Sequence, residues 1–154
     1  MSEDIAISVR GLKTAYGTSV VHENLDLDVR TGEVLGVIGP SGTGKSVLLR
    51  AIVGLKRPDE GTVEVFGKNV TDLSGDSLRD VQNLWGIMFQ DGALFSNLTV
   101  RENVMVPMKE HAHLPKSLMR ELADQKIRMS GLSTSAGPKY PSDLSGGMRK
   151  RVAL

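Results

Sequence analysis

The sequence predicts an α/β fold that combines N-terminal antiparallel β strands, a parallel sheet and a mostly helical region. The first observation is an apolar run, VLGVIG at 34–39, that leads through a glycine-rich loop into a helical pattern. This order is typical of a strand buried on both faces of a parallel sheet and followed by a helix. The second is an alternation of apolar and polar residues near the N-terminus, which indicates half-buried strands. The third is the replacement of strand patterns by helix signals after residue 90.

The composition is that of one soluble globular domain. The chain has 154 residues, of which 40% are hydrophobic and 24% charged, and its net charge is +1. This balance gives no electrostatic case for a nucleic-acid partner. The lack of cysteine excludes disulfides and thiolate metal sites. The sequence shows no signal-peptide pattern and no apolar run of about 20 residues, so no membrane span is predicted, while docking on a membrane protein stays open.

Periodicity and turn residues assign the elements up to residue 90. Apolar residues alternate with polar ones in two stretches, which predicts two antiparallel strands: Ile5, Ile7 and Val9, then Leu25, Leu27 and Val29. After the apolar strand 34–39, a helix is expected from about 45 to 55, with this buried face: Val47, Leu48, Ala51, Ile52 and Leu55. The remaining expected elements are turns at 30–33 and 57–61, a strand at 62–67, a short helix at 76–83 capped by Asp76, and a buried strand at 86–90.

Helix signals dominate the rest of the chain. Thr99 and Glu102 have the spacing of a capping box, so a helix is expected to begin there, with Pro107 kinking or ending it. A second helix is expected over about 116–130, with Gly131 just after its end. Its apolar stripe is Met119, Leu122, Ala123 and Ile127. The sequence therefore predicts an α/β core at 1–90, a helical part at 91–144 and a final helix at 145–154.

The segment GPSGTGKS at 39–46 fits the pattern G-x-x-x-x-G-K-[ST], a phosphate-binding loop, between a predicted strand and a predicted helix. Its glycines let successive N–H groups form an anion-binding nest, to which the helix N-terminus adds its positive dipole end. Lys45 is expected to reach the β- and γ-phosphates, and the Ser46 hydroxyl to coordinate Mg²⁺. The predicted binding residues here are Gly39, Pro40, Ser41, Gly42, Thr43, Gly44, Lys45, Ser46 and Val47.

A phosphate-binding loop alone leaves kinases, GTPases and motor ATPases open. The segment LSGGM at 144–148, placed after such a loop and a helical region, resembles the signature motif of ATP-binding-cassette (ABC) ATPases. The resemblance implies a P-loop NTPase core and a helical subdomain. It also implies that Ser145, Gly146 and Gly147 bind the γ-phosphate of ATP held by a second ATPase subunit, in a head-to-tail homodimer. A serine hydroxyl and glycine amides at a helix N-terminus suit that role.

Two further residues fall in the family's order. Tyr16 in TAYG is similar to the aromatic residue that stacks on adenine, a role that suits a π-face. Gln90 in MFQD resembles the glutamine that touches Mg²⁺ and the attacking water, which makes it, with Lys45, a predicted catalytic residue and, with Ser46, a predicted metal ligand. The expected cofactors are ATP and Mg²⁺.

The segments 89–115 and 140–154 look like the ATPase subunits of Mla/Mce-type bacterial lipid transporters, including Met148 where most family members carry glutamine. The resemblance implies transmembrane permease subunits as partners, a place on the cytoplasmic face of the cell membrane, and a phospholipid or another hydrophobic solute as cargo.

The family's Walker B strand, which ends in Asp-Glu, and its D-loop and switch histidine are not found in the 154 residues. We therefore expect a truncated gene product or a fragment of a longer protein, with poor hydrolysis by this chain alone and an unpaired apolar sheet edge. Two alternatives stay open, a non-hydrolytic nucleotide-binding module and a soluble ABC ATPase that acts on DNA or ribosomes. No Asn-Lys-x-Asp motif supports a GTPase.

Overall fold

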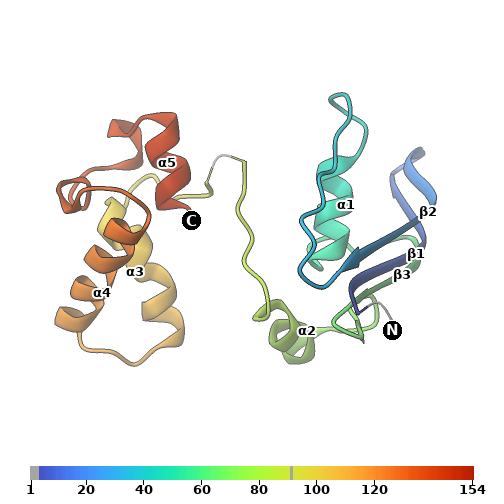
Figure 1. The fold of residues 1–154 in the computed structure, drawn as a ribbon, viewed down its shortest axis with the longest axis horizontal. Helices are drawn as coiled ribbons and strands as arrows, with labels where there is room; N and C mark the ends of the chain where they lie inside the picture. The colour runs from blue at the N-terminus through green and yellow to red at the C-terminus, as the bar shows by residue number, and fades with distance from the viewer. Residues whose placement is uncertain (1–3, 91) are drawn as a thin grey trace. The chain divides into compact units, whose positions relative to one another are not determined.

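The computed structural model describes residues 4–90 and 92–154, which divide into two compact units, Met1–Gly86 and Ile87–Leu154. Each unit has its own buried core, and the two are described separately (Figure 1). None of the helices in the described residues is long and apolar enough to cross a membrane.

The first unit contains a four-stranded antiparallel sheet in the order β2-β1-β3-β4. Its strands are β1 (Ile5–Tyr16), β2 (Ser19–Arg30), β3 (Glu60–Val65) and β4 (Lys68–Asn69). The two N-terminal strands expected from alternation are confirmed, and they extend to a tight hairpin at Gly17. The strand expected at 62–67 is confirmed as β3, and it turns into β4 through Phe66 and Gly67, both with positive φ.

Helix α1 (Lys45–Ile52) begins where the sequence predicts and buries Leu48, Ala51 and Ile52 against Val9, Leu12 and Val63 of the sheet. It ends earlier than the expected residue 55. Gly54 adopts φ +72°, and the N–H groups of Leu55 and Lys56 both donate to Arg50 O, at 2.8 and 3.0 Å. This left-handed glycine closes the helix and leaves Leu55 half exposed instead of on the buried face.

The strands expected at 34–39 and 86–90 are not present. Residues 33–40 form no strand, with Val34 98% and Ile38 94% exposed, and residues 86–90 also lack strand pairing. A parallel strand exists only through ladder hydrogen bonds to neighbouring strands. The strands in the described residues pair antiparallel with one another and leave no neighbour for either segment. These apolar side chains lie outside the four-stranded sheet, so they form no sheet edge.

Helix α2 (Gly75–Gln82) confirms the short helix expected near 76–83, but Asp76 is not its cap. Ser74 occupies the N-cap position, and Asp76 lies in the first turn, where its carboxylate pairs with Arg79 at 3.3 Å. Val81 of α2 is buried in the core of the first unit.

The second unit is helical, with α3 (Val100–His111), α4 (Lys116–Met129) and α5 (Gly146–Val152). Two short 3₁₀ turns, Thr134–Ala136 and Pro141–Asp143, lie between α4 and α5. The capping box of Thr99 and Glu102 is confirmed in full. Pro107 lies inside α3 and does not end it. At the end of α4, Gly131 has φ +76°, and Leu132 N donates to Ile127 O at 3.1 Å, which confirms the predicted glycine stop.

Candidate functional site

The loop 39–46 has backbone geometry that suits an anion. Gly42 and Gly44 have φ values of +86° and +89°, in the left-handed region that favours glycine. Val47 N and Leu48 N donate to Gly44 O, at 2.8 and 2.9 Å. No acceptor in the described part of the chain takes the N–H groups of residues 42–46. Those donors stand at the start of α1, where the helix dipole is positive, so the loop fits a phosphate group.

Lys45 places its ammonium group in this loop. Its Nζ donates to Gly39 O at 2.8 Å and to Pro40 O at 2.6 Å. Thr43 Oγ1 also donates to Pro40 O, at 2.9 Å, so the loop folds back over its own lysine. The ammonium therefore lies beside the free N–H groups, and a bound phosphate would exchange its contacts with neutral carbonyls for charge-assisted ones.

Gly44 is required by its surroundings as well as by its φ. A Cβ added there would lie 2.5 Å from Val21 Cγ1 and 2.6 Å from His22 Nε2. The start of α1 therefore presses directly on β2. Any other residue at 44 would push the phosphate loop away from the sheet that supports it.

His22 is a buried support for the loop that the sequence does not single out. Its Nδ1 lies 2.7 Å from the hydroxyl of Thr14, which is fully buried, and the histidine is 9% exposed. Burial lowers the pKa of the imidazole, because the charged ring would lose its hydration. The neutral ring therefore packs under Gly44. Its place in an alternating strand gives no hint of this contact.

This burial predicts a pH-dependent stability. The unfolded chain binds the proton of His22 more readily than the folded chain, so the full stability is present above the unfolded pKa of about 6.5 and is lost as the pH falls through it. We expect urea unfolding to show lower stability at pH 5.5 than at pH 7.5, and His22→Gln to reduce the difference. The exposed His113 is the matched control, and His113→Gln should keep the wild-type difference. If His22→Gln kept the wild-type difference in stability between pH 5.5 and pH 7.5, a group other than His22 would cause it.

Tyr16, the predicted adenine-stacking residue, is the last residue of β1 and is 53% exposed. One face of its ring is covered by the Lys56 ammonium, 4.9 Å from the ring centroid. Lys56 lies just before the turn 57–61, and Asp59 lies within it. The sequence predicts only a turn at these positions. The contact of Lys56 with Tyr16 spans about forty positions, so no local signal reports it.

The predicted signature residues begin α5. The Ser145 hydroxyl accepts from Met148 N at 3.3 Å and caps the helix. Gly146 and Gly147 are exposed, with open space where a Cβ would stand. Leu144, just before them, is buried with Val100, Ile127 and Leu132, which fixes the start of α5 to the helical unit.

Gln90 lies exposed in a turn of the second unit, whereas Lys45 and Ser46 lie in the first. The structure therefore groups Tyr16 with the phosphate loop in one unit, and Gln90 with Ser145 in the other. In the described residues, no cluster of three or more His, Cys, Asp or Glu side chains forms a metal site.

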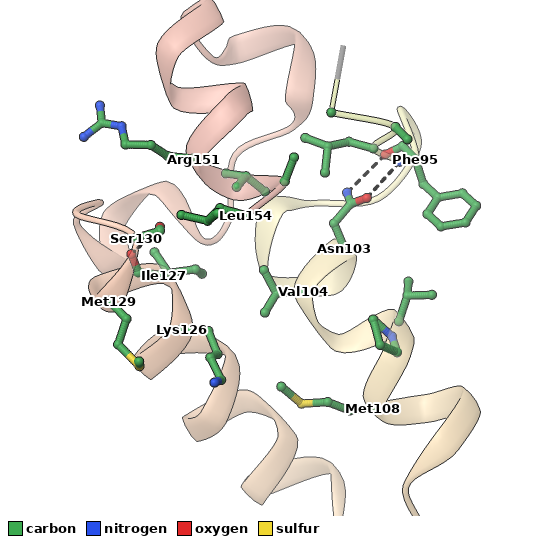
Figure 2. Close-up of a pocket in the computed structure, with 17 residues that line it drawn as sticks. Phe95, Asn103, Val104, Met108, Lys126, Ile127, Met129, Ser130, Arg151 and Leu154 are labelled. Atoms are coloured by element: carbon green, nitrogen blue, oxygen red, sulfur yellow. Dashed lines mark hydrogen bonds between the residues drawn. The ribbon is translucent and has the colours of Figure 1, made fainter. Parts of the chain in front are cut away.

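A cavity of about 630 Å³ lies within the second unit, between α3, the end of α4 and residues 151–154 (Figure 2). Its lining is largely apolar and includes Met108, Ile127 and Leu154. Beside it, Figure 2 shows Asn103 hydrogen-bonded to Phe95. None of the predicted site residues lines this cavity.

Comparisons with known proteins identify the family of the chain. A family model described as "ABC transporter" matches residues 22–154. The chain is 39% identical over 154 residues to the probable ribonucleotide transport ATP-binding protein mkl of Mycobacterium leprae, and the match covers 100% of this chain and 44% of that protein. It is 36% identical over 156 residues to the intermembrane phospholipid transport system ATP-binding protein MlaF of Escherichia coli, covering 100% of this chain and 58% of the relative. The chain thus spans about half the length of these curated relatives.

Among solved structures, the dimeric ATP-binding cassette MJ0796 in a post-hydrolysis state, bound to ADP and Pi, matches with a TM-score of 0.85 and 29% sequence identity. The match covers 96% of this chain and 66% of that one. These findings confirm the predicted fold class.

Proposed function

This chain belongs to the ABC transporter family, and from that premise we propose that it is the ATP-binding, energy-coupling subunit of a transporter. The observation that carries the proposal is the loop 39–46, where unpartnered N–H groups and the Lys45 ammonium converge at the start of α1. A triphosphate supplies the negative charge that this arrangement lacks.

In the proposed site the residues 39–47 bind the phosphates, and Tyr16 stacks on the adenine ring. Lys45 neutralises charge on the β- and γ-phosphates, and the Ser46 hydroxyl, exposed at the start of α1, is a Mg²⁺ ligand. Gln90 is proposed as a second ligand that also orients the attacking water. The magnesium ion would neutralise charge on the phosphate oxygens.

Ser145, Gly146 and Gly147 are proposed to bind the γ-phosphate held by a second copy of the subunit. Their support is the open glycine backbone at the N-terminus of α5 and the capped Ser145. The proposed assembly is a head-to-tail dimer that docks on transmembrane permease subunits at the cytoplasmic face of the membrane. In functional terms, residues 1–90 would hold the nucleotide, 91–144 would form the helical subdomain, and 145–154 would carry the signature.

The proposed cargo is a phospholipid or another hydrophobic solute. The support is similarity to MlaF proteins, including that of Haemophilus influenzae at 39% identity over 148 residues, with 96% of this chain and 56% of the relative covered. A relative named for ribonucleotide transport has similar identity to this chain.

The test is purification of the gene product from its native membrane, followed by assay of ATPase activity in the complex. We expect a permease to co-purify and phosphate release to depend on it. A product that binds ATP but pairs with no permease would contradict the transport role.

The alternative proposal is a nucleotide-binding module without turnover, which needs only the loop 39–46. It predicts stabilisation of about 2.7 kcal/mol at an ATP concentration of 100 times Kd, without phosphate release.

A further inference from the structure

The turn after α1 binds the backbone just before Tyr16. The ladder between β1 and β3 ends at the pair Lys13 and Glu60, and Asp59 N donates to Lys13 O at 2.8 Å. Beyond that pair, β1 has no β3 residue opposite it, and side chains of the turn form the hydrogen bonds instead. Ala15 N donates to Asp59 Oδ2 at 2.7 Å, and Lys56 Nζ donates to Ala15 O at 3.3 Å. Both polar groups of Ala15 are therefore held by one turn.

The same lysine covers the Tyr16 ring. Its Nζ lies 4.9 Å from the ring centroid and 3.7 Å from Asp59 Oδ2, and its side chain is only 17% exposed. A partly desolvated ammonium over a tyrosine face is attracted by the ring quadrupole. Asp59 pairs with this lysine, so one face of the ring is covered by a paired ammonium, while 53% of Tyr16 stays open to solvent.

We propose that Lys56 and Asp59 are positioning residues for nucleobase recognition, which hold Tyr16 so that its free face receives the adenine ring. This inference rests on the proposed function, because it assigns a role to the nucleotide site. The lysine acts in two ways. It restricts the tyrosine to one orientation before the base arrives, and it closes the second face, so the base has a single place to stack.

The position of the turn connects this role to the phosphate loop. Helix α1 begins at the loop, where Gly44 presses on Val21 and His22 of β2. The turn that follows α1 holds Ala15 and Tyr16 at the end of β1. Contacts at the start of α1 and in the turn after it therefore both reach the β1–β2 hairpin. They fix Tyr16 relative to the helix that is proposed to bind phosphate.

The experiment compares binding of Mg·ATP with binding of Mg·tripolyphosphate, which has no base. For Lys56→Met we expect ATP affinity to fall about 5-fold while tripolyphosphate affinity stays within about 1.5-fold of wild type. Lys56→Arg keeps a cation over the ring and should restore ATP binding. Tyr16→Ala should weaken ATP about 20-fold, and adding Lys56→Met to it should cause no further loss.

Asp59→Asn is a second variant, because it keeps an acceptor for Ala15 N and removes the charge that anchors Lys56. We expect it to lower ATP affinity about 2-fold with no change for tripolyphosphate. Lys68→Met, at an exposed lysine of β4, is the matched control and should bind both ligands as wild type does.

Three results would overturn the inference. The first is an equal loss of affinity for ATP and tripolyphosphate in Lys56→Met, and the second is a further loss of ATP affinity when Lys56→Met is added to Tyr16→Ala. The third is wild-type ATP affinity in both Lys56→Met and Asp59→Asn. A wild-type chain that binds neither ligand would instead refute the proposed function, so the two failures are distinguishable.

Discussion

Replacing Lys45 with methionine is expected to lower the affinity for Mg·ATP by about 100-fold. The ammonium lies in the loop with only neutral partners, at 2.6 to 2.8 Å from Gly39 O and Pro40 O and 3.4 Å from Thr43 Oγ1. Its charge-assisted bonds to phosphate are worth about 1.5–3 kcal/mol, and about 2.7 kcal/mol corresponds to 100-fold in Kd. Calorimetric titration of both proteins measures the change.

The fold should tolerate this change, because the hydrogen bonds that Lys45 loses are exposed ones. We expect the free energy of unfolding without nucleotide to change by less than about 0.5 kcal/mol. Lys68→Met controls for the loss of one positive charge from the same unit. If Lys45→Met and Lys68→Met bound Mg·ATP equally well, the loop 39–46 would not be the phosphate site.

Replacing Asn103 with alanine is expected to destabilise the helical unit by about 3 kcal/mol. The side chain is 8% exposed, and its Oδ1 accepts from Phe95 N at 2.8 Å. Its Nδ2 donates to the carbonyl oxygens of Phe95, Leu98 and Thr99, at 3.0 to 3.1 Å. Alanine leaves Phe95 N and Leu98 O without a partner, while Phe95 O keeps Leu98 N and Thr99 O keeps the backbone N–H of residue 103. Each unpaired group costs about 1–3 kcal/mol where water does not enter.

Hydrogen exchange in α3 and urea unfolding of the chain measure this loss. Asn97 lies exposed in the same loop, so Asn97→Ala is the matched control and should change stability by less than about 0.5 kcal/mol. Equal stability of the Asn103→Ala and wild-type chains would mean that the loop 95–99 does not depend on this side chain.

The features that the sequence predicts well are those with local causes. The capping box of Thr99, the glycine stop at Gly131 and the glycine-rich start of α1 each depend on residues within about one helical turn. The phosphate loop is predictable for the same reason, since its glycines, lysine and helix are contiguous.

The predictions of strands at 34–39 and 86–90 were wrong. An apolar composition indicates a preference for burial, but a strand also needs a neighbouring strand to complete its hydrogen bonds. Contacts between distant segments were missed for a related reason. His22 under Gly44, and Lys56 over Tyr16, join positions that no periodicity connects. Only the register of β1 with β2 and β3, together with the place of α1, brings them together.

Equilibrium titration of Mg·ATP into the folded wild-type chain is the most direct test of the nucleotide site. Saturable binding at one site per chain is expected, with competition by Mg·tripolyphosphate, because the loop 39–46 is proposed to bind the phosphates with its unpartnered N–H groups and Lys45. A chain with its helices and sheet intact by circular dichroism that took up no Mg·ATP at millimolar concentration would contradict the central claim.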